Sequence, residues 1–135
     1  MTASINYEGS LRCTAVHNQS GTQIITDAPT DNRGKGEAFS PTDLVCTALG
    51  TCIITTMAIK ATDMGIELKN TGLEVQKYMS KEPPRRIVKI DVTLQIPALN
   101  ITDKDKELLQ KVGDGCPVAR SLAAGLELNV IYNWA

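Results

Sequence analysis

The chain has 135 residues, a length that fits one domain able to bury most of an apolar core. Its composition, with 42% hydrophobic and 21% charged residues, is typical of a globular protein and excludes an intrinsically disordered one. The net charge of −1 gives no reason to expect nucleic acid or an anionic membrane as a partner. We therefore expect a single globular domain over residues 1–135.

The cysteines bear on the compartment and on metal binding. The start of the chain, MTASINYEGS, has no basic segment followed by an apolar run, so we expect no signal peptide and a cytoplasmic location. In the reducing cytosol the four cysteines, Cys13, Cys46, Cys52 and Cys116, are not expected to form a permanent disulfide framework. Because they form no C-x-x-C motif and His17 is the single histidine, we also expect no metal site.

The N-terminal part is predicted to be β-structure. Residues 5–17, INYEGSLRCTAVH, alternate as a strand does, with one face formed by Ile5, Tyr7, Leu11, Cys13 and Ala15. Ser20-Gly21 marks a turn into the next strand, TQIIT. The polar, glycine-rich segment 28–39 is too long for a simple turn and is a candidate functional loop.

A long helix is predicted over residues 41–63. Ser40 is a suitable N-cap, Pro41 suits the first helical position, and Asp43 can complete a capping box. Gly65 suits the left-handed residue that follows a helix.

The same helix contains an uncharged stretch, LVCTALGTCIITTMAI, at residues 44–59. It has sixteen residues, four of them threonine, which is too short and too polar for a membrane span of about twenty apolar residues. We therefore predict a buried helix and no membrane association. A helix that is apolar all round must be enclosed by protein on nearly every side, and a chain this small has little material with which to enclose it. An obligate homodimer is the expected solution.

In the remainder of the chain, the predicted strands are grouped and do not alternate regularly with helices. Residues 73–79 and 85–96 form a hairpin whose core face is made by Val88, Ile90, Val92, Leu94 and Ile96. A helix capped by Thr102 and Asp105 ends at Val112 and is broken by Gly113-Asp114-Gly115; a short helix then runs from Cys116-Pro117 to Gly125, and a strand follows at 126–134. Because the strands are grouped, the predicted fold class is α+β.

Cys116 is a candidate reactive cysteine on physical grounds. The order Gly115-Cys116-Pro117 places its sulfur at or near a helix N-terminus, where backbone N–H groups favour thiolate over thiol. Arg120, four residues on, either adds positive charge or faces solvent. A small residue packed at a tight turn fits the same sequence, so function and packing both stay open.

Cys52 lies in the third turn of the long helix, two residues after Gly50. A glycine within a helix costs about 1 kcal/mol relative to alanine, which favours close approach of another element or a ligand there. From the residues alone, however, a cysteine on an apolar helix is more often inert core. Cys46, about 240° around the helix from Cys52, is predicted to be core, and so is Cys13.

Three stretches taken together resemble the OsmC/Ohr family of thiol peroxidases. They are SPTDLVCTALGTC at 40–52, GCPVARSL at 115–122, and YEGSL at 7–11 followed by GKGE at 34–37. The resemblance covers essentially the whole chain. It implies an α+β fold in which β(3)-α-β(2)-α(2)-β subunits form a swapped dimer around a long buried helix, in agreement with the element order above.

The resemblance also implies roles for the two cysteines, Cys52 as the peroxidatic and Cys116 as the resolving one. The Cys52 thiolate would attack an organic hydroperoxide and become a sulfenic acid, Cys116 would condense with it to a disulfide, and an external thiol would reduce the disulfide. No cofactor is implied. The apolar wall of Leu49, Ile53 and Met57 would bind the organic tail of the substrate.

A buried thiol needs help to ionise, because desolvation raises its pKa. In the family that help comes from an arginine of the N-terminal strands, held by a carboxylate near the helix start. Arg12 is the first candidate, and Arg33, which we also count as substrate-binding, is the second. Thr42 stands at the family's usual glutamate position, so the carboxylate would be Asp43 or Glu37.

A different class of function keeps the fold and the apolar cleft without catalysis. Such a non-enzymatic redox-sensing or small-molecule-binding protein would let Cys52 oxidise once, with no turnover by any reductant.

Overall fold

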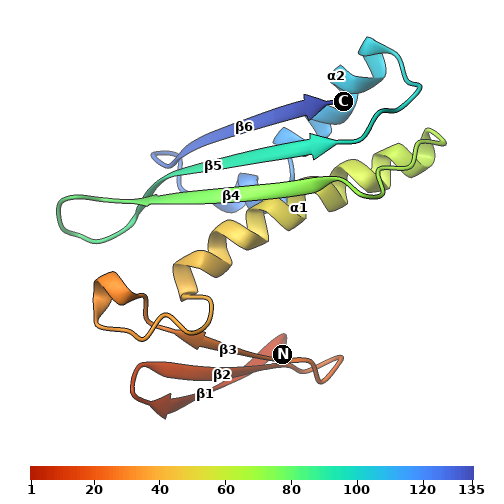
Figure 1. Cartoon of the computed structure of the whole chain (residues 1–135). Helices are drawn as coiled ribbons and strands as arrows, with labels where there is room; N and C mark the ends of the chain where they lie inside the picture. Colours follow the sequence, from red (N-terminus) through yellow and green to blue (C-terminus); the bar gives the residue numbers. More distant parts are fainter. The chain divides into compact units, whose positions relative to one another are not determined.

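The computed structural model describes all residues, 1–135, and the chain divides into two compact units, Met1–Val45 and Cys46–Ala135. Each unit holds one three-stranded sheet (Figure 1). The element order is three strands, a long helix, two strands, two helices and a strand, which confirms the predicted α+β class and order. The single domain over residues 1–135 stays a prediction.

The first unit contains the antiparallel sheet β1-β2-β3, formed by Ala3–Gly9, Arg12–His17 and Gln23–Asp27. The expectation of one strand over residues 5–17 was wrong, because the chain reverses at Gly9, Ser10 and Leu11, all of which have positive φ. Only the glycine adopts that conformation at low cost, so the turn carries a weak sequence signal. The hairpin nevertheless keeps the predicted face together, because Ile5 pairs with Ala15 and Tyr7 with Cys13.

The sheet of the first unit has no apolar core of its own. Every buried hydrophobic residue of the chain lies at or beyond Cys46. Ile5 is 71% exposed and Phe39 55% exposed, and Cys13 is half-buried, so the prediction that Cys13 is a core residue was wrong. Apolar side chains left open to this extent are a surface that another polypeptide can cover.

Helix α1, Pro41–Asp63, has the predicted bounds. The backbone N–H of Ser40 donates to the Asp43 carboxylate over 2.9 Å, and the N–H of Asp43 donates to the Ser40 hydroxyl over 3.1 Å. These reciprocal bonds are a capping box, as predicted. Gly65, with φ 71°, follows the helix in the left-handed conformation.

The sequence argument against a membrane span, that the apolar segment is too short, has to be corrected for the length of α1. The 23-residue helix is long and apolar enough to cross a membrane by length and composition, because it extends beyond the uncharged run at both ends. Within the chain, one face is buried, formed by Cys46, Leu49, Gly50, Ile53, Met57 and Ala61. Ile59 is 64% exposed, so a single chain does not enclose the helix on nearly every side as expected.

The second unit contains the sheet β4-β5-β6, formed by Gly72–Met79, Ile87–Ile96 and Glu127–Trp134. Strand β5 is central, antiparallel to β4 and parallel to β6. Its predicted core face is confirmed for Ile90, Val92, Leu94 and Ile96, which are buried, whereas Val88 is half-buried. The close approach predicted at Gly50 is present, because a Cβ there would lie 2.9 Å from a methyl group of Val75.

Helix α2 is Asp103–Asp114 and helix α3 is Pro117–Ser121. Thr102 and Asp105 form the predicted capping box. The helix does not break at Gly113, because that residue is buried and its missing side chain lets α2 pack closely against Met57 and Tyr132. The final helix ends at Ser121 and not at Gly125.

Candidate functional site

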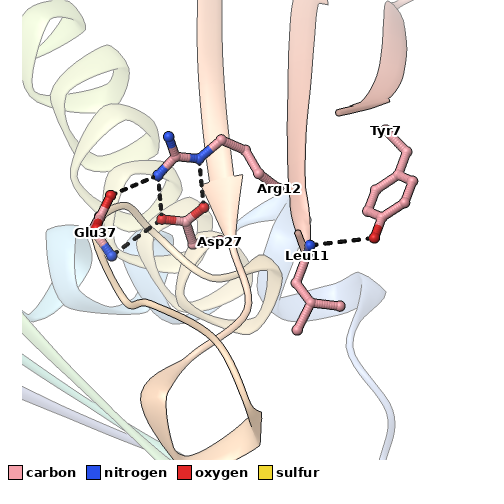
Figure 2. Close-up of polar contacts among 5 residues, drawn as sticks. All are labelled: Tyr7, Leu11, Arg12, Asp27 and Glu37. Atoms are coloured by element: carbon pink, nitrogen blue, oxygen red, sulfur yellow. Dashed lines mark hydrogen bonds and ion pairs between the residues drawn. The ribbon is translucent and has the colours of Figure 1, made fainter. Parts of the chain in front are cut away.

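The residues predicted for the site fall into a charged group in the first unit and a cysteine group in the second. In the charged group, Arg12 of β2 pairs across the sheet with Asp27 at the end of β3. The guanidinium donates two hydrogen bonds to the Asp27 carboxylate, 2.7 Å from Nε and 2.8 Å from Nη2 (Figure 2). This bidentate geometry fixes the direction in which the Arg12 charge points.

Asp27 and Glu37 hold Arg12 in different ways. The Asp27 side chain is 3% exposed and also accepts a 3.2 Å bond from the Glu37 N–H, whereas the Glu37 carboxylate is 62% exposed and accepts from Arg12 Nη2 over 3.1 Å. The hydrogen bonds from Arg12 hold the pKa of Asp27 below its ordinary value, although burial opposes this shift. The same bonds raise the pKa of Arg12, which therefore stays charged.

Asp27 is the residue of this group that the sequence interpretation missed. The register decides this pairing: Val16 lies opposite Gln23, which puts Arg12 opposite Asp27, whereas counting from the predicted turn at Ser20-Gly21 would have put Pro29 there. The other two candidates, Arg33 and Asp43, have different local surroundings. Arg33 is exposed at the end of a short 3-10 helix, Thr30–Asn32, and Asp43 accepts the N–H of Ser40 at the start of α1.

The cysteine group brings together two residues that are far apart in sequence. Cys52 is half-buried on α1, with its sulfur 3.9 Å from the hydroxyl of Thr56, and Cys116 is fully buried at the start of α3. Cys52 acts on the Cys116 thiol and raises its pKa, so the two side chains are neighbours, and both are free thiols.

The protonation of Cys116 differs from what a helix N-terminus suggests. Burial is the largest effect and raises the pKa of the Cys116 thiol; the contact with Cys52 raises it further. The N–H groups of Ala119 and Val118 act in the opposite direction without outweighing burial. Desolvation penalises the thiolate more than a helix of five residues stabilises it, so Cys116 is held as a neutral thiol.

Arg120 does not serve the thiol as a charged neighbour. Its Nε donates to the carbonyl of Gly115 over 2.7 Å, and its backbone N–H donates to the carbonyl of Cys116 over 3.1 Å. The side chain is exposed and stabilises the turn between α2 and α3. Of the two alternatives left open for Arg120, the structure favours the one in which its side chain faces solvent, with an added role in backbone geometry.

A cavity of about 380 Å³ lies within the second unit. Two of the predicted substrate-binding residues, Leu49 and Ile53, line it, together with Gly113, Asp114, Ala119, Leu128, Asn129 and Val130. Met57 is instead packed in the core against Gly113. No three His, Cys, Asp or Glu side chains are grouped as a metal site would require.

Comparisons with known proteins show which family this chain is similar to. A family model described as OsmC-like protein matches residues 34–131. A crystal structure from Psychrobacter arcticus 273-4, of a protein assigned to the osmotic stress induced and detoxification response, is 42% identical, with 98% of this chain and 95% of that chain covered and a TM-score of 0.92. Among curated proteins no significant match is found.

More distant structures share the fold. The organic hydroperoxide resistance protein OsmC of Legionella pneumophila is 15% identical, with 98% and 97% of the two chains covered and a TM-score of 0.72. An organic hydroperoxide resistance protein of Vibrio cholerae O1, with captopril bound in one of its active sites, is 14% identical, with 98% and 92% covered and a TM-score of 0.75.

The pairing of Arg12 with Asp27 predicts an acid-sensitive first unit. We expect Asp27→Asn to lower the hydrogen-exchange protection of the β2 and β3 amides at pH 7. Because the folded-state pKa of Asp27 lies below the ordinary 3.8, its stabilisation is present above about pH 4 and is lost as the pH falls through the folded value. The difference between wild type and variant should therefore shrink below pH 4.

Glu37→Gln, which removes the exposed partner of Arg12, is the matched control and should cause a smaller loss of protection. A deficit of Asp27→Asn that is equally large at pH 3 and pH 7 would contradict the role assigned to the ion pair.

Proposed function

The chain belongs to the OsmC family, and from this premise we propose that it is a thiol-dependent reductase of organic hydroperoxides. The observation that carries the proposal is that two free cysteines, Cys52 and Cys116, are neighbours in this fold. Fold neighbours from three bacteria bear the name organic hydroperoxide resistance protein, which supports the same substrate class.

Cys52 is the better candidate for attack on the peroxide. It is half-buried, whereas Cys116 is fully buried and its pKa is raised, so an incoming peroxide reaches Cys52 first. Its thiolate attacks the distal oxygen of R–O–O–H, the O–O bond breaks, and R–O⁻ leaves and takes up a proton as R–OH. Cys52 then carries the sulfenic acid.

Cys116 completes the cycle as the resolving cysteine. Its sulfur attacks the sulfur of the Cys52 sulfenic acid, the S–OH bond breaks, and the hydroxide leaves as water with the proton of the Cys116 thiol. Two equivalents of an external thiol then reduce the disulfide. A neutral, buried thiol in contact with Cys52 fits this second role, because it is sheltered from the peroxide itself.

Arg12 is our candidate for stabilising the Cys52 thiolate. Its permanent charge and fixed orientation are what a desolvated anion requires, and Asp27 with Glu37 supplies that orientation. Asp27 thus takes the part for which the sequence offered Glu37 or Asp43. The organic tail of the substrate would occupy the cavity lined by Leu49 and Ile53.

We further propose that the protein works as a homodimer in a reducing compartment such as the cytosol. The first unit leaves Ile5, Tyr7 and Phe39 more than half exposed, and α1 leaves Ile59 64% exposed. A second copy of the chain can cover such surfaces, in the manner of a swapped dimer.

The cysteine assignment is tested by single and multiple turnover with cumene hydroperoxide. Cys52→Ser should consume no peroxide, and Cys116→Ser should react once and stop at the sulfenic acid, because no internal thiol is left to resolve it. Cys13→Ser is the matched control and should keep wild-type turnover. The measurement is thiol consumption together with intact mass. Oxidation of wild-type Cys52 without turnover by dithiols or monothiols would instead favour the non-enzymatic alternative.

The choice between two arginines is tested by Arg12→Gln and Arg33→Gln. Loss of Arg12 should slow the reaction of Cys52 with peroxide roughly tenfold or more, since a nearby opposite charge favours an ionised group by that order. Arg33→Gln, an exposed loop charge, should change the rate little. The readout is the stopped-flow rate at pH 7 in protein whose fold is verified by circular dichroism. The reverse order of effects would transfer the role to Arg33.

The homodimer is tested by sedimentation equilibrium. We expect a particle of twice the chain mass of 14.6 kDa that persists on dilution to nanomolar concentration. A stable monomer with peroxidase activity would exclude an obligate dimer.

A further inference from the structure

The Tyr132 side chain connects the sheet of the second unit to the end of helix α2. Tyr132 lies on β6, and its hydroxyl donates to the Asp114 carboxylate over 2.8 Å, with the carbonyl of Gln110 3.3 Å away. Burial and the Asp114 charge both raise the pKa of Tyr132, which keeps the hydroxyl protonated as a donor. We call Tyr132 with Asp114 and Gln110 the Tyr132 latch.

The latch acts on the segment that carries Cys116. A Cβ added to Gly113 would lie 2.7 Å from the Tyr132 oxygen and 2.9 Å from the Met57 sulfur, so both side chains pack directly on the backbone there. The carbonyl of Gly113 accepts the N–H of Cys116 over 3.2 Å. One hydrogen bond therefore separates the backbone of Cys116 from the residue that Tyr132 touches.

The other hydrogen bonds of this turn come from α2 and α3, including one from the N–H of Gly115 to the carbonyl of Lys111 over 3.2 Å. Arg120 binds the carbonyls of Gly115 and Cys116, which stiffens the turn locally. It does not tie the turn to the sheet. Cys52 and Tyr132 both pack against the core cluster to which β5 contributes. Tyr132 thus links the turn of Cys116 to the layer on which Cys52 rests.

We infer that Tyr132 is a positioning residue for the resolving step and that its hydroxyl, through Asp114, holds Cys116 against Cys52. The inference rests on the proposed function for its catalytic consequence. In that step the S–S bond forms as the S–OH bond of the Cys52 sulfenic acid breaks, and water leaves with the Cys116 proton. The two sulfurs must be in contact for this to occur, and a displacement of about 1 Å can cost on the order of 100-fold in rate.

Tyr132→Phe removes the hydroxyl and keeps the ring. In single turnover with one equivalent of cumene hydroperoxide, we expect the first step, oxidation of Cys52, to keep its wild-type rate. Disulfide formation should slow about ten- to 100-fold, and dimedone should trap more sulfenic acid. Tyr78→Phe is the matched control, because Tyr78 makes a similar 3.0 Å bond to Asp91 on the same sheet, and it should change neither step.

Asp114 provides a rescue series. Asp114→Asn keeps an oxygen that accepts the Tyr132 hydrogen bond and should resolve at a near-wild-type rate, whereas Asp114→Ala should behave like Tyr132→Phe. A general loss of folding would slow both steps and lower the melting temperature, so the split between the two steps separates positioning from stability. Wild-type disulfide formation in folded Tyr132→Phe overturns the inference.

A peroxide-free measurement separates this inference from the proposed function. In a buffer of oxidised and reduced dithiothreitol, the Cys52–Cys116 disulfide forms at equilibrium without peroxide. Tyr132→Phe should lower its equilibrium constant about tenfold, which corresponds to about 30 mV. If Tyr132→Phe causes this shift although the wild-type protein does not react with peroxide, the latch is retained and the reductase function is rejected. An unchanged constant, or no disulfide in the wild type, would reject the latch.

Discussion

The proximity of Cys52 and Cys116 is the constraint on which the proposed chemistry of this protein depends. The two residues belong to different elements, α1 and the start of α3, and they meet because both elements pack on one core. Two glycines permit that packing. Gly50 admits Val75 of β4 to the helix backbone, and Gly113 admits Met57 and Tyr132 to the end of α2. A side chain at either position would push apart the elements that hold the thiols together.

Burial, more than the helix N-terminus, decides how the two thiols differ. Cys116 has the sequence context of an activated thiolate, yet its complete burial raises its pKa, and five residues of helix do not compensate. Cys52 does not lie at a helix N-terminus, and no neighbouring residue in the sequence indicates that it is activated. It is nevertheless the more accessible of the two sulfurs. In our proposal, this difference in exposure assigns attack on the peroxide to Cys52 and resolution to Cys116.

The first unit is stabilised by charge and by hydrogen bonds rather than by an apolar core. Its buried residues are polar, Asp27 and Ser40, and each is satisfied by hydrogen bonds: Asp27 by Arg12, and Ser40 by Asp43. A carboxylate that is 3% exposed is tolerated only because the Arg12 fork compensates its lost hydration. In our proposal, a second copy of the chain covers the exposed apolar side chains of this unit. Arg12 becomes part of a catalytic site through this dimer formation.

The sequence by itself determined the features that rest on local signals. The bounds of α1, the capping boxes, the core face of β5 and the two cysteine motifs all follow from residues within a few positions of one another. The partners of the key groups follow from tertiary structure. Asp27 is 15 residues from Arg12, and Asp114 is 18 residues from Tyr132. Sheet register and packing bring such pairs together, and the resulting hydrogen bonds and burial then shift the pKa values of Asp27 and Tyr132. Neither effect has a local sequence pattern, because a side chain's hydration depends on what the rest of the chain places around it.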